Sequence, residues 1–303
     1  MFWKVFGKIA LAIVLMLLFN LIVSVPIGIV GALLVASQTG GELDPMSLAV
    51  ALQGMPALST ISFALSSAAA IGAAALMYKA FERDRAWRMG WNESGRARKL
   101  GLGLLAGIGL IGAGFAVLLA FGAIRAEAVP ATREVAALIG WNLLLFVTVG
   151  FSEEIFSRGY VYGLVRKHGG VVAAVAVSSV LFALLHAMNA AVFTNAFPMI
   201  NLTLAGVMLA LLREATGGLW APIGMHISWN FAQGDIFGFA VSGIETASLF
   251  ELSIAKPFLA GGDFGFEGSP VCTAITLAFC AALVYAIRKR NGAANDRMAG
   301  EQG

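Results

Sequence analysis

Eight long apolar stretches dominate the sequence and constrain its fold more than any other feature. A helix that crosses about 30 Å of hydrocarbon needs roughly 20 mostly apolar residues. The stretches are bounded by charged or turn-forming residues and lie at about Ile9–Ala36, Leu58–Tyr78, Leu100–Ile124, Val135–Phe151, Val171–Ala187, Phe197–Leu212, Leu219–Ala240 and Val271–Ile287. Composition agrees, since 59% of the residues are hydrophobic and only 12% are charged. We therefore predict an all-α, polytopic membrane protein with about eight transmembrane helices, and we exclude a soluble enzyme, a disordered chain and a disulfide scaffold.

The basic residues predict the orientation of these helices. In membrane proteins Lys and Arg collect in the short cytoplasmic loops. When the N-terminus and alternate loops share one side, that side holds all 20 basic residues except Arg125, Arg133 and Lys256. This predicts an N-in, C-in topology, with the first helix retained rather than cleaved as a signal peptide. The net charge of +3 then reflects topology and gives no reason to expect nucleic acid as a partner.

Three parts are predicted along the chain. Residues 1–134 hold helices one to three, and residues 135–241 form a transmembrane core that contains the candidate site residues. Residues 242–303 hold an outer loop, the last helix and a basic cytoplasmic tail. We expect the Gly-rich stretch from about Ser242 to Ser269 to lie over the outer mouth of the bundle, and the tail after Arg290 to be disordered. Gly103 and Gly107 form a GxxxG pattern, which predicts close helix packing.

Polar side chains within predicted spans are the main functional candidates, because ionisable groups at membrane depth are costly and are retained where they line a cavity. They occur in three groups: Glu153, Glu154 and Arg158 after the fourth stretch, His186 in the fifth, and His226 with Asn230 in the seventh. A basic break at Arg166–Lys167 is expected after the fourth stretch, and His168 is expected in the solvated inner loop there. Asp235 could either line the site or cap a solvated helix end.

Helical geometry assigns different tasks to the two adjacent glutamates. Neighbouring residues project about 100° apart, so Glu153 and Glu154 cannot face one centre in the same way. Glu154 and Arg158 are spaced i,i+4 with the acid first, which favours an ion pair. Glu153 is then free to face the bundle interior, where a carboxylate can take and return a proton.

The remaining groups could complete a hydrolytic site. His226 and Asn230 are also i,i+4 and could present two donors to a developing oxyanion, while His186 could hold a water against Glu153. Cys272 and Cys280 have no neighbouring acid or histidine, and no GxSxG is present, so a nucleophilic mechanism is disfavoured. Each group alone could be an ordinary polar helix boundary or packing residue. The three groups together favour a shared site.

The ordered blocks Glu153-Glu154-x-x-x-Arg158, Phe182-x-x-x-His186 and His226-x-x-x-Asn230 resemble the CPBP family of intramembrane proteases, also called the CAAX-protease and bacteriocin-processing or ABI family. The resemblance covers about 80 residues, from Phe151 to Asn230. It implies a membrane endopeptidase in a prokaryotic cytoplasmic (inner) membrane, acting on a peptide or membrane-protein segment.

The resemblance also implies roles for the residues that match these blocks. Glu153 and His186 would activate water, His226 and Asn230 would stabilise the oxyanion, and Glu154 with Arg158 would support the site. The family is often described as metalloproteases, and Glu153, Glu154, His186 and His226 could in principle bind zinc. No HExxH is present, however, and glutamate–water chemistry needs no metal.

Two other functions remain open from the sequence. The first is a non-catalytic membrane protein of the same family, such as an immunity or scaffold factor, in which the polar set binds a ligand or holds helices together. The second is an ion-coupled transporter, since intramembrane Glu and His also serve as proton relays. Transporters usually show repeated halves, and this sequence shows none.

Overall fold

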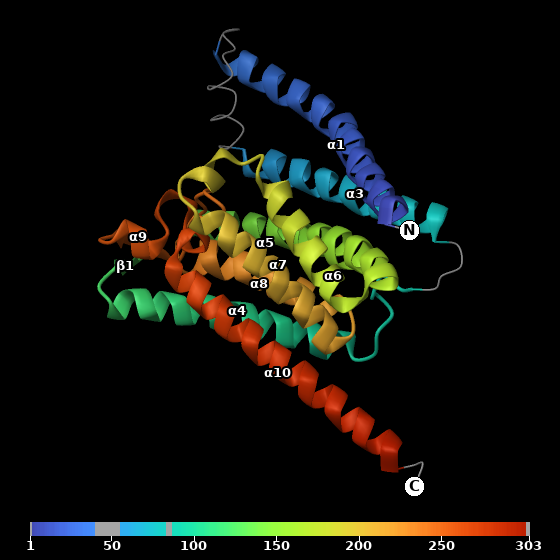
Figure 1. Cartoon of the computed structure of the whole chain (residues 1–303). Helices are drawn as coiled ribbons and strands as arrows, with labels where there is room; N and C mark the ends of the chain where they lie inside the picture. Colours follow the sequence, from blue (N-terminus) through green and yellow to red (C-terminus); the bar gives the residue numbers. More distant parts are fainter. Residues whose placement is uncertain (1, 40–54, 83–86, 301–303) are drawn as a thin grey trace.

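Long helices form almost the whole of the computed structural model, which describes residues 2–39, 55–82 and 87–300 (Figure 1). In chain order the long helices are α1 (Phe2–Thr39), α3 (Pro56–Phe81), α4 (Arg96–Ala120), α5 (Arg133–Glu154), α6 (Tyr162–His186), α7 (Phe197–Thr216), α8 (Trp220–Phe231) and α10 (Pro270–Gly300). Each predicted apolar stretch is helical over most of its length. Six helical runs in the described residues are long and apolar enough to cross a membrane, which confirms a polytopic helical protein.

The predicted break between the fourth and fifth stretches is present, but it lies at Gly170, a few residues after Arg166–Lys167. Helix α5 continues through a π-helical segment, Ile155–Val161, into α6, and the chain leaves helical geometry only at Gly170, with φ 76° and ψ −176°. The helix persists because residues 155–165 are buried within the bundle. A positive φ is readily adopted by glycine, so the chain can reverse at this point. The fourth and fifth predicted spans are therefore the two arms of a helical hairpin that reverses at Gly170.

The seventh predicted span is also corrected. Helix α8 has only 12 residues, about 18 Å of helix, and passes into a π-helical turn, Ala232–Ile236. Every residue from Ala221 to Asn230 is buried, so this apolar stretch is a core helix of the protein and not a lipid-facing span. Six long runs are counted in place of about eight, because the two arms joined at Gly170 form one run and α8 is short. The N-in, C-in orientation stays a prediction.

Two of the charges that we counted toward the inner loops, Arg83 and Arg85, lie outside the described residues. A third, Arg158, is fully buried in the protein and is not a loop residue. His168 lies half-buried in the last helical turn before Gly170 and not in a loop.

The ends of the helices hold further differences from the sequence prediction. Helix α4 stops at Ala120, and after Gly122 the chain forms β1 (Ile124–Ala128), which pairs antiparallel with β2 (Phe250–Ile254). The Gly-rich stretch contains β2, the short helix α9 (Pro257–Ala260) and two 3-10 turns, and Phe264 and Phe266 anchor it in the core. Helix α10 runs ten residues beyond Arg290, to Gly300, so the prediction that these residues are disordered is wrong.

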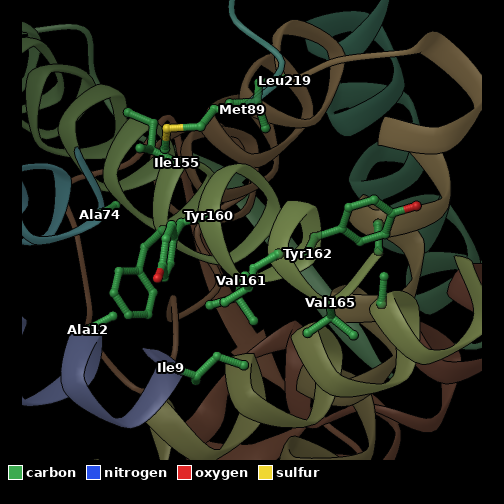
Figure 2. Packing of buried hydrophobic residues seen from close by; sticks show 14 of the residues in the cluster. Ile9, Ala12, Ala74, Met89, Ile155, Tyr160, Val161, Tyr162, Val165 and Leu219 are labelled. Carbon is green, nitrogen blue, oxygen red and sulfur yellow. The ribbon is translucent and has the colours of Figure 1, made fainter. Parts of the chain in front are cut away.

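The bundle has apolar surfaces both inside and outside. Figure 2 shows part of its core, where Tyr160 and Tyr162 point in different directions from one helical stretch and Leu219 approaches Met89. On the outside, large side chains such as Ile22 and Val172 are 69% and 83% exposed. Exposed apolar surface on this scale suits contact with lipid.

Glycines allow α4 to lie directly against α8. A Cβ atom added at Gly107 would come within 2.6 Å of the Met225 carbonyl oxygen and 2.8 Å of the Trp229 amide nitrogen. Gly103 meets the α8 backbone in the same way, at Met225 N. This confirms the close packing predicted from the GxxxG pattern.

We expect Gly107→Ala to lower the free energy of unfolding by about 1–3 kcal/mol, because the added methyl group must push two packed helices apart. Gly109→Ala, on the same helix, is the matched control, since its Cβ would meet nothing within 4 Å. Thermal unfolding in detergent micelles should show a lower Tm for the first variant only. Equal Tm values would mean that the α4–α8 contact is looser than described.

Candidate active site

The predicted site residues Glu153, His186, His226 and Asn230 all line one cavity of about 1310 Å³. The cavity lies between α3, α5, α6, α7 and α8 and is closed on one side by residues 241–247. The reversal at Gly170 explains how Glu153 and His186 meet. Glu153 precedes Gly170 by 17 positions and His186 follows it by 16, so the two arms of the hairpin return to the same level.

Glu153 faces the two imidazole rings. Its Oε2 atom lies 3.9 Å from His186 Nε2 and 3.8 Å from His226 Nε2. The side chain is 33% exposed, but Oε2 itself is buried and has no hydrogen-bond partner among the described residues. Both distances are too long for direct hydrogen bonds, and they suit a contact through one bridging water.

Glu154 points away from the cavity and makes two strong contacts. Its Oε1 atom accepts hydrogen bonds from Arg158 Nη1 and from His226 Nδ1, both at 2.9 Å. The expected ion pair is present, and both of its side chains are fully buried. The contact with His226, which helical spacing did not predict, orients the ring whose Nε2 faces Glu153.

Arg158 is held by two further contacts. Its Nη2 atom donates to the Gly206 carbonyl oxygen at 3.2 Å, and its guanidinium lies 4.2 Å from the centre of the Phe182 ring. The Phe182 ring also packs against His186 and His226, at 4.7 and 6.0 Å between ring centres. Phe182, to which the sequence assigned no role, thus packs on three of the polar groups. Its place one turn before His186 was the available signal.

The hydrogen bonds define which ring nitrogens carry protons. A carboxylate and a carbonyl oxygen only accept, so the proton lies on Nδ1 of His226, which faces Glu154, and on Nδ1 of His186, which is 2.8 Å from the Phe182 carbonyl oxygen. In a neutral ring the Nε2 atom is then an acceptor. His226 can donate from Nε2 only as an imidazolium, a form that the neighbouring carboxylates favour.

The sequence interpretation also missed residues that shape the cavity wall. Asn189 donates to the Ser242 carbonyl oxygen at 2.7 Å, and Glu267 Oε2 accepts from the Ser242 amide and hydroxyl. These bonds hold residues 241–247 over the cavity. The available signal was a polar residue, Asn189, just after the end of α6 at His186.

Asp235 matches neither of the two roles that the sequence left open. Its side chain is fully buried and accepts a hydrogen bond from Asn142 Nδ2 at 2.7 Å. Asn142, and not Asp235, lines the cavity. Asp235 therefore contacts the cavity wall from behind.

The polar groups do not form a metal site. In the ranges that the structure describes, no group of three His, Cys, Asp or Glu side chains could hold a metal ion. Glu154 faces away and is already paired with Arg158 and His226, which leaves Glu153 and two imidazoles. The four candidate zinc ligands therefore do not surround one point.

Comparison with known proteins supplies the family. Residues 135–232 match the family model of type II CAAX prenyl endopeptidases, described as Rce1-like. No match was found among curated proteins or among solved structures. The matched segment contains the three polar blocks and the whole Gly170 hairpin. Residues 135–232 of this multi-pass membrane protein therefore match the CPBP/CAAX protease family.

Proposed function

We propose that the cavity is the active site of an intramembrane endopeptidase that hydrolyses a peptide bond with a directly activated water. The observation that carries this proposal is the unpartnered Oε2 atom of Glu153, which faces the Nε2 atoms of His186 and His226 at the cavity wall. A buried carboxylate oxygen without a partner is costly, so its retention indicates a chemical role. The family match supports the same reaction class.

Water activation follows from the proton positions. A water bound between Glu153 Oε2 and His186 Nε2 would donate one hydrogen to each, because both atoms are acceptors. Its oxygen lone pair would then point to a substrate carbonyl carbon in the cavity. As the C–O bond forms, Glu153 takes a proton from the water, and it later returns this proton to the leaving nitrogen when the C–N bond breaks.

Charge that develops on the substrate oxygen needs donors nearby. The imidazolium form of His226 would present its Nε2–H, and Asn230, one turn later on α8, would present its side-chain amide. The Glu154 carboxylate, 2.9 Å from His226 Nδ1, stabilises that cation. Arg158 in turn holds Glu154 in place through the hydrogen bond at 2.9 Å. Glu154 and Arg158 are therefore positioning residues.

The substrate class follows from the cavity and the setting. The cavity is lined by apolar side chains together with Ser, Thr, Asn and Glu, which suits a peptide or membrane-protein segment in extended form. We place the protein in a prokaryotic inner membrane, because its short basic loops are typical of one. A non-catalytic immunity or scaffold protein is the alternative that the following experiment separates.

The test compares wild-type protein with Glu153→Ala in a host membrane and searches by mass spectrometry for new peptide termini. Termini that appear with the wild type and vanish with the variant would establish proteolysis and name substrates. If neither protein produced new termini while both were folded and abundant, the non-catalytic function would replace the proposal.

Chelators should leave the cleavage rate unchanged. The reaction derived above uses a carboxylate and two imidazoles, and the described side chains offer no three-ligand metal site. Purified protein would be dialysed against 1,10-phenanthroline and assayed on an identified substrate. Loss of activity that returns with Zn²⁺ and not with Mg²⁺ would contradict this mechanism.

A further inference from the structure

A second cavity, of about 430 Å³, lies where residues 87–93, the end of α7 and helices α6 and α10 meet. It is separate from the Glu153 site, and none of its lining residues also lines the first cavity. Charged side chains dominate its wall. They are Arg88, Arg166, Arg213, Arg290, Glu93 and Glu214.

The two carboxylates in this wall already have partners. Glu93 accepts hydrogen bonds from Lys99 Nζ at 2.6 Å and from the Trp220 amide at 3.0 Å. Glu214 accepts from Arg166 at 2.9 and 3.1 Å and from the Tyr162 hydroxyl at 2.7 Å. Because four arginines face only two glutamates, and Lys99 adds another positive charge, the cavity has an excess of positive charge.

Arg213 is a buried positive charge in the wall of this second cavity. Its side chain is 7% exposed, its Nη2 atom donates to the carbonyl oxygens of Arg88 and Met89, and its guanidinium stacks on the Tyr162 ring at 4.5 Å. In Figure 2 the Tyr162 ring points away from Tyr160. The Nη1 atom of Arg213 is buried and has no partner among the described residues. A buried guanidinium nitrogen left unpaired costs free energy, so an acceptor from outside the chain would satisfy it.

Two more arginines at this cavity retain free donors. Arg290 uses Nη1 to bind the carbonyl oxygens of Glu214 and Ala215, at 3.1 and 2.9 Å, which orients its guanidinium at the cavity wall. Arg88 is exposed and contacts no carboxylate among the described residues. Guanidinium groups bind phosphate oxygens with paired donors, and several around one space favour a multivalent oxyanion over a single carboxylate.

We propose that this cavity binds a phosphate group, presented either by the headgroup of an anionic phospholipid or by a free phosphate compound. Its volume lies within the range of about 300–1,000 Å³ that small ligands occupy. Basic cavities between helices at a membrane surface bind anionic headgroups by the same chemistry. The bound group would pair with Arg213 Nη1 and link α7 to α10 and to residues 87–93.

The test uses the full-length protein in micelles of a neutral detergent. Thermal unfolding is followed while dioleoyl phosphatidylglycerol, dioleoyl phosphatidylcholine or inorganic phosphate is titrated, with sulfate-free buffer at constant ionic strength. We expect saturable stabilisation by phosphatidylglycerol or by inorganic phosphate, but none by phosphatidylcholine. Stabilisation by the lipid alone assigns the headgroup, and stabilisation by both assigns phosphate in general.

The variants Arg88→Gln and Arg290→Gln should each weaken the apparent affinity about tenfold, because each removes a charge at the cavity. Both side chains are exposed, so folding should be preserved. Arg288→Gln is the matched control, since it makes the same change on α10 at an exposed position outside the cavity. Equal weakening by the control, equal stabilisation by phosphatidylcholine, or no saturable effect of any probe would overturn the proposal.

Discussion

Glu153→Gln is expected to abolish peptide-bond cleavage while the protein stays folded. Glutamine keeps the shape of the side chain but cannot take a proton from water. Loss of a positioned general base typically costs about 10²–10⁴ in rate. We expect the upper part of that range, because His186 alone would have to serve as the base. Folding should be unaffected, since Glu153 Oε2 makes no hydrogen bond among the described residues.

The measurement is a single-turnover cleavage rate on an identified substrate, with Tm recorded for each protein. Glu134→Gln is the matched control, because Glu134 lines the same cavity but lies exposed at the start of α5, away from the imidazoles. His186→Asn should reduce the rate without raising the substrate KM. A Glu153→Gln protein that cleaved at the wild-type rate would remove Glu153 from the mechanism.

The sequence predicted contacts within one helix better than contacts between helices. The Glu154–Arg158 pair follows from i,i+4 spacing, and the structure has it at 2.9 Å. The bond from His226 to Glu154 joins residues 72 positions apart, and no local rule indicates it. Spacing could show that Glu153 and Glu154 differ, but not that Glu154 orients the ring that faces Glu153.

The hairpin at Gly170 was missed for a different reason. Charged residues usually mark the end of a membrane helix, so Arg166 and Lys167 suggested a loop. In the structure Arg166 pairs with Glu214 on α7, and Lys167 pairs with Glu82 after α3, so both charges are compensated while the helix continues. The glycine four residues later carried the true signal. The turn at Gly170 brings His186 back beside Glu153.

Helix α8 was assigned wrongly because its sequence is as apolar as that of a membrane span. A run of apolar residues predicts burial but does not say whether lipid or protein covers it. Helix α8 is enclosed by protein on all sides, which allows His226 and Asn230 to lie on a fully buried helix beside the cavity. The glycines of α4 make that enclosure possible, because they let the α8 backbone approach.

Breaking the buried ion pair should be costly, and restoring neutrality should recover the fold without the activity. Arg158→Ala leaves the Glu154 carboxylate buried without its cation, which typically costs about 3–5 kcal/mol. The double variant Glu154→Gln with Arg158→Met buries no charge and keeps an acceptor oxygen for His226 Nδ1. Replacing a buried pair by neutral residues of similar size is often close to neutral for stability.

Cleavage by the double variant should nevertheless fall about 10²–10³-fold, because a neutral amide cannot stabilise the His226 imidazolium that donates to the oxyanion. The measurement is a double-mutant cycle in Tm combined with single-turnover rates. A structural role alone would make activity return together with stability in the double variant. Recovery of Tm with a rate that stays low would instead show that the Glu154 charge acts through His226. A buried ion pair that served stability alone would not affect the rate in this way.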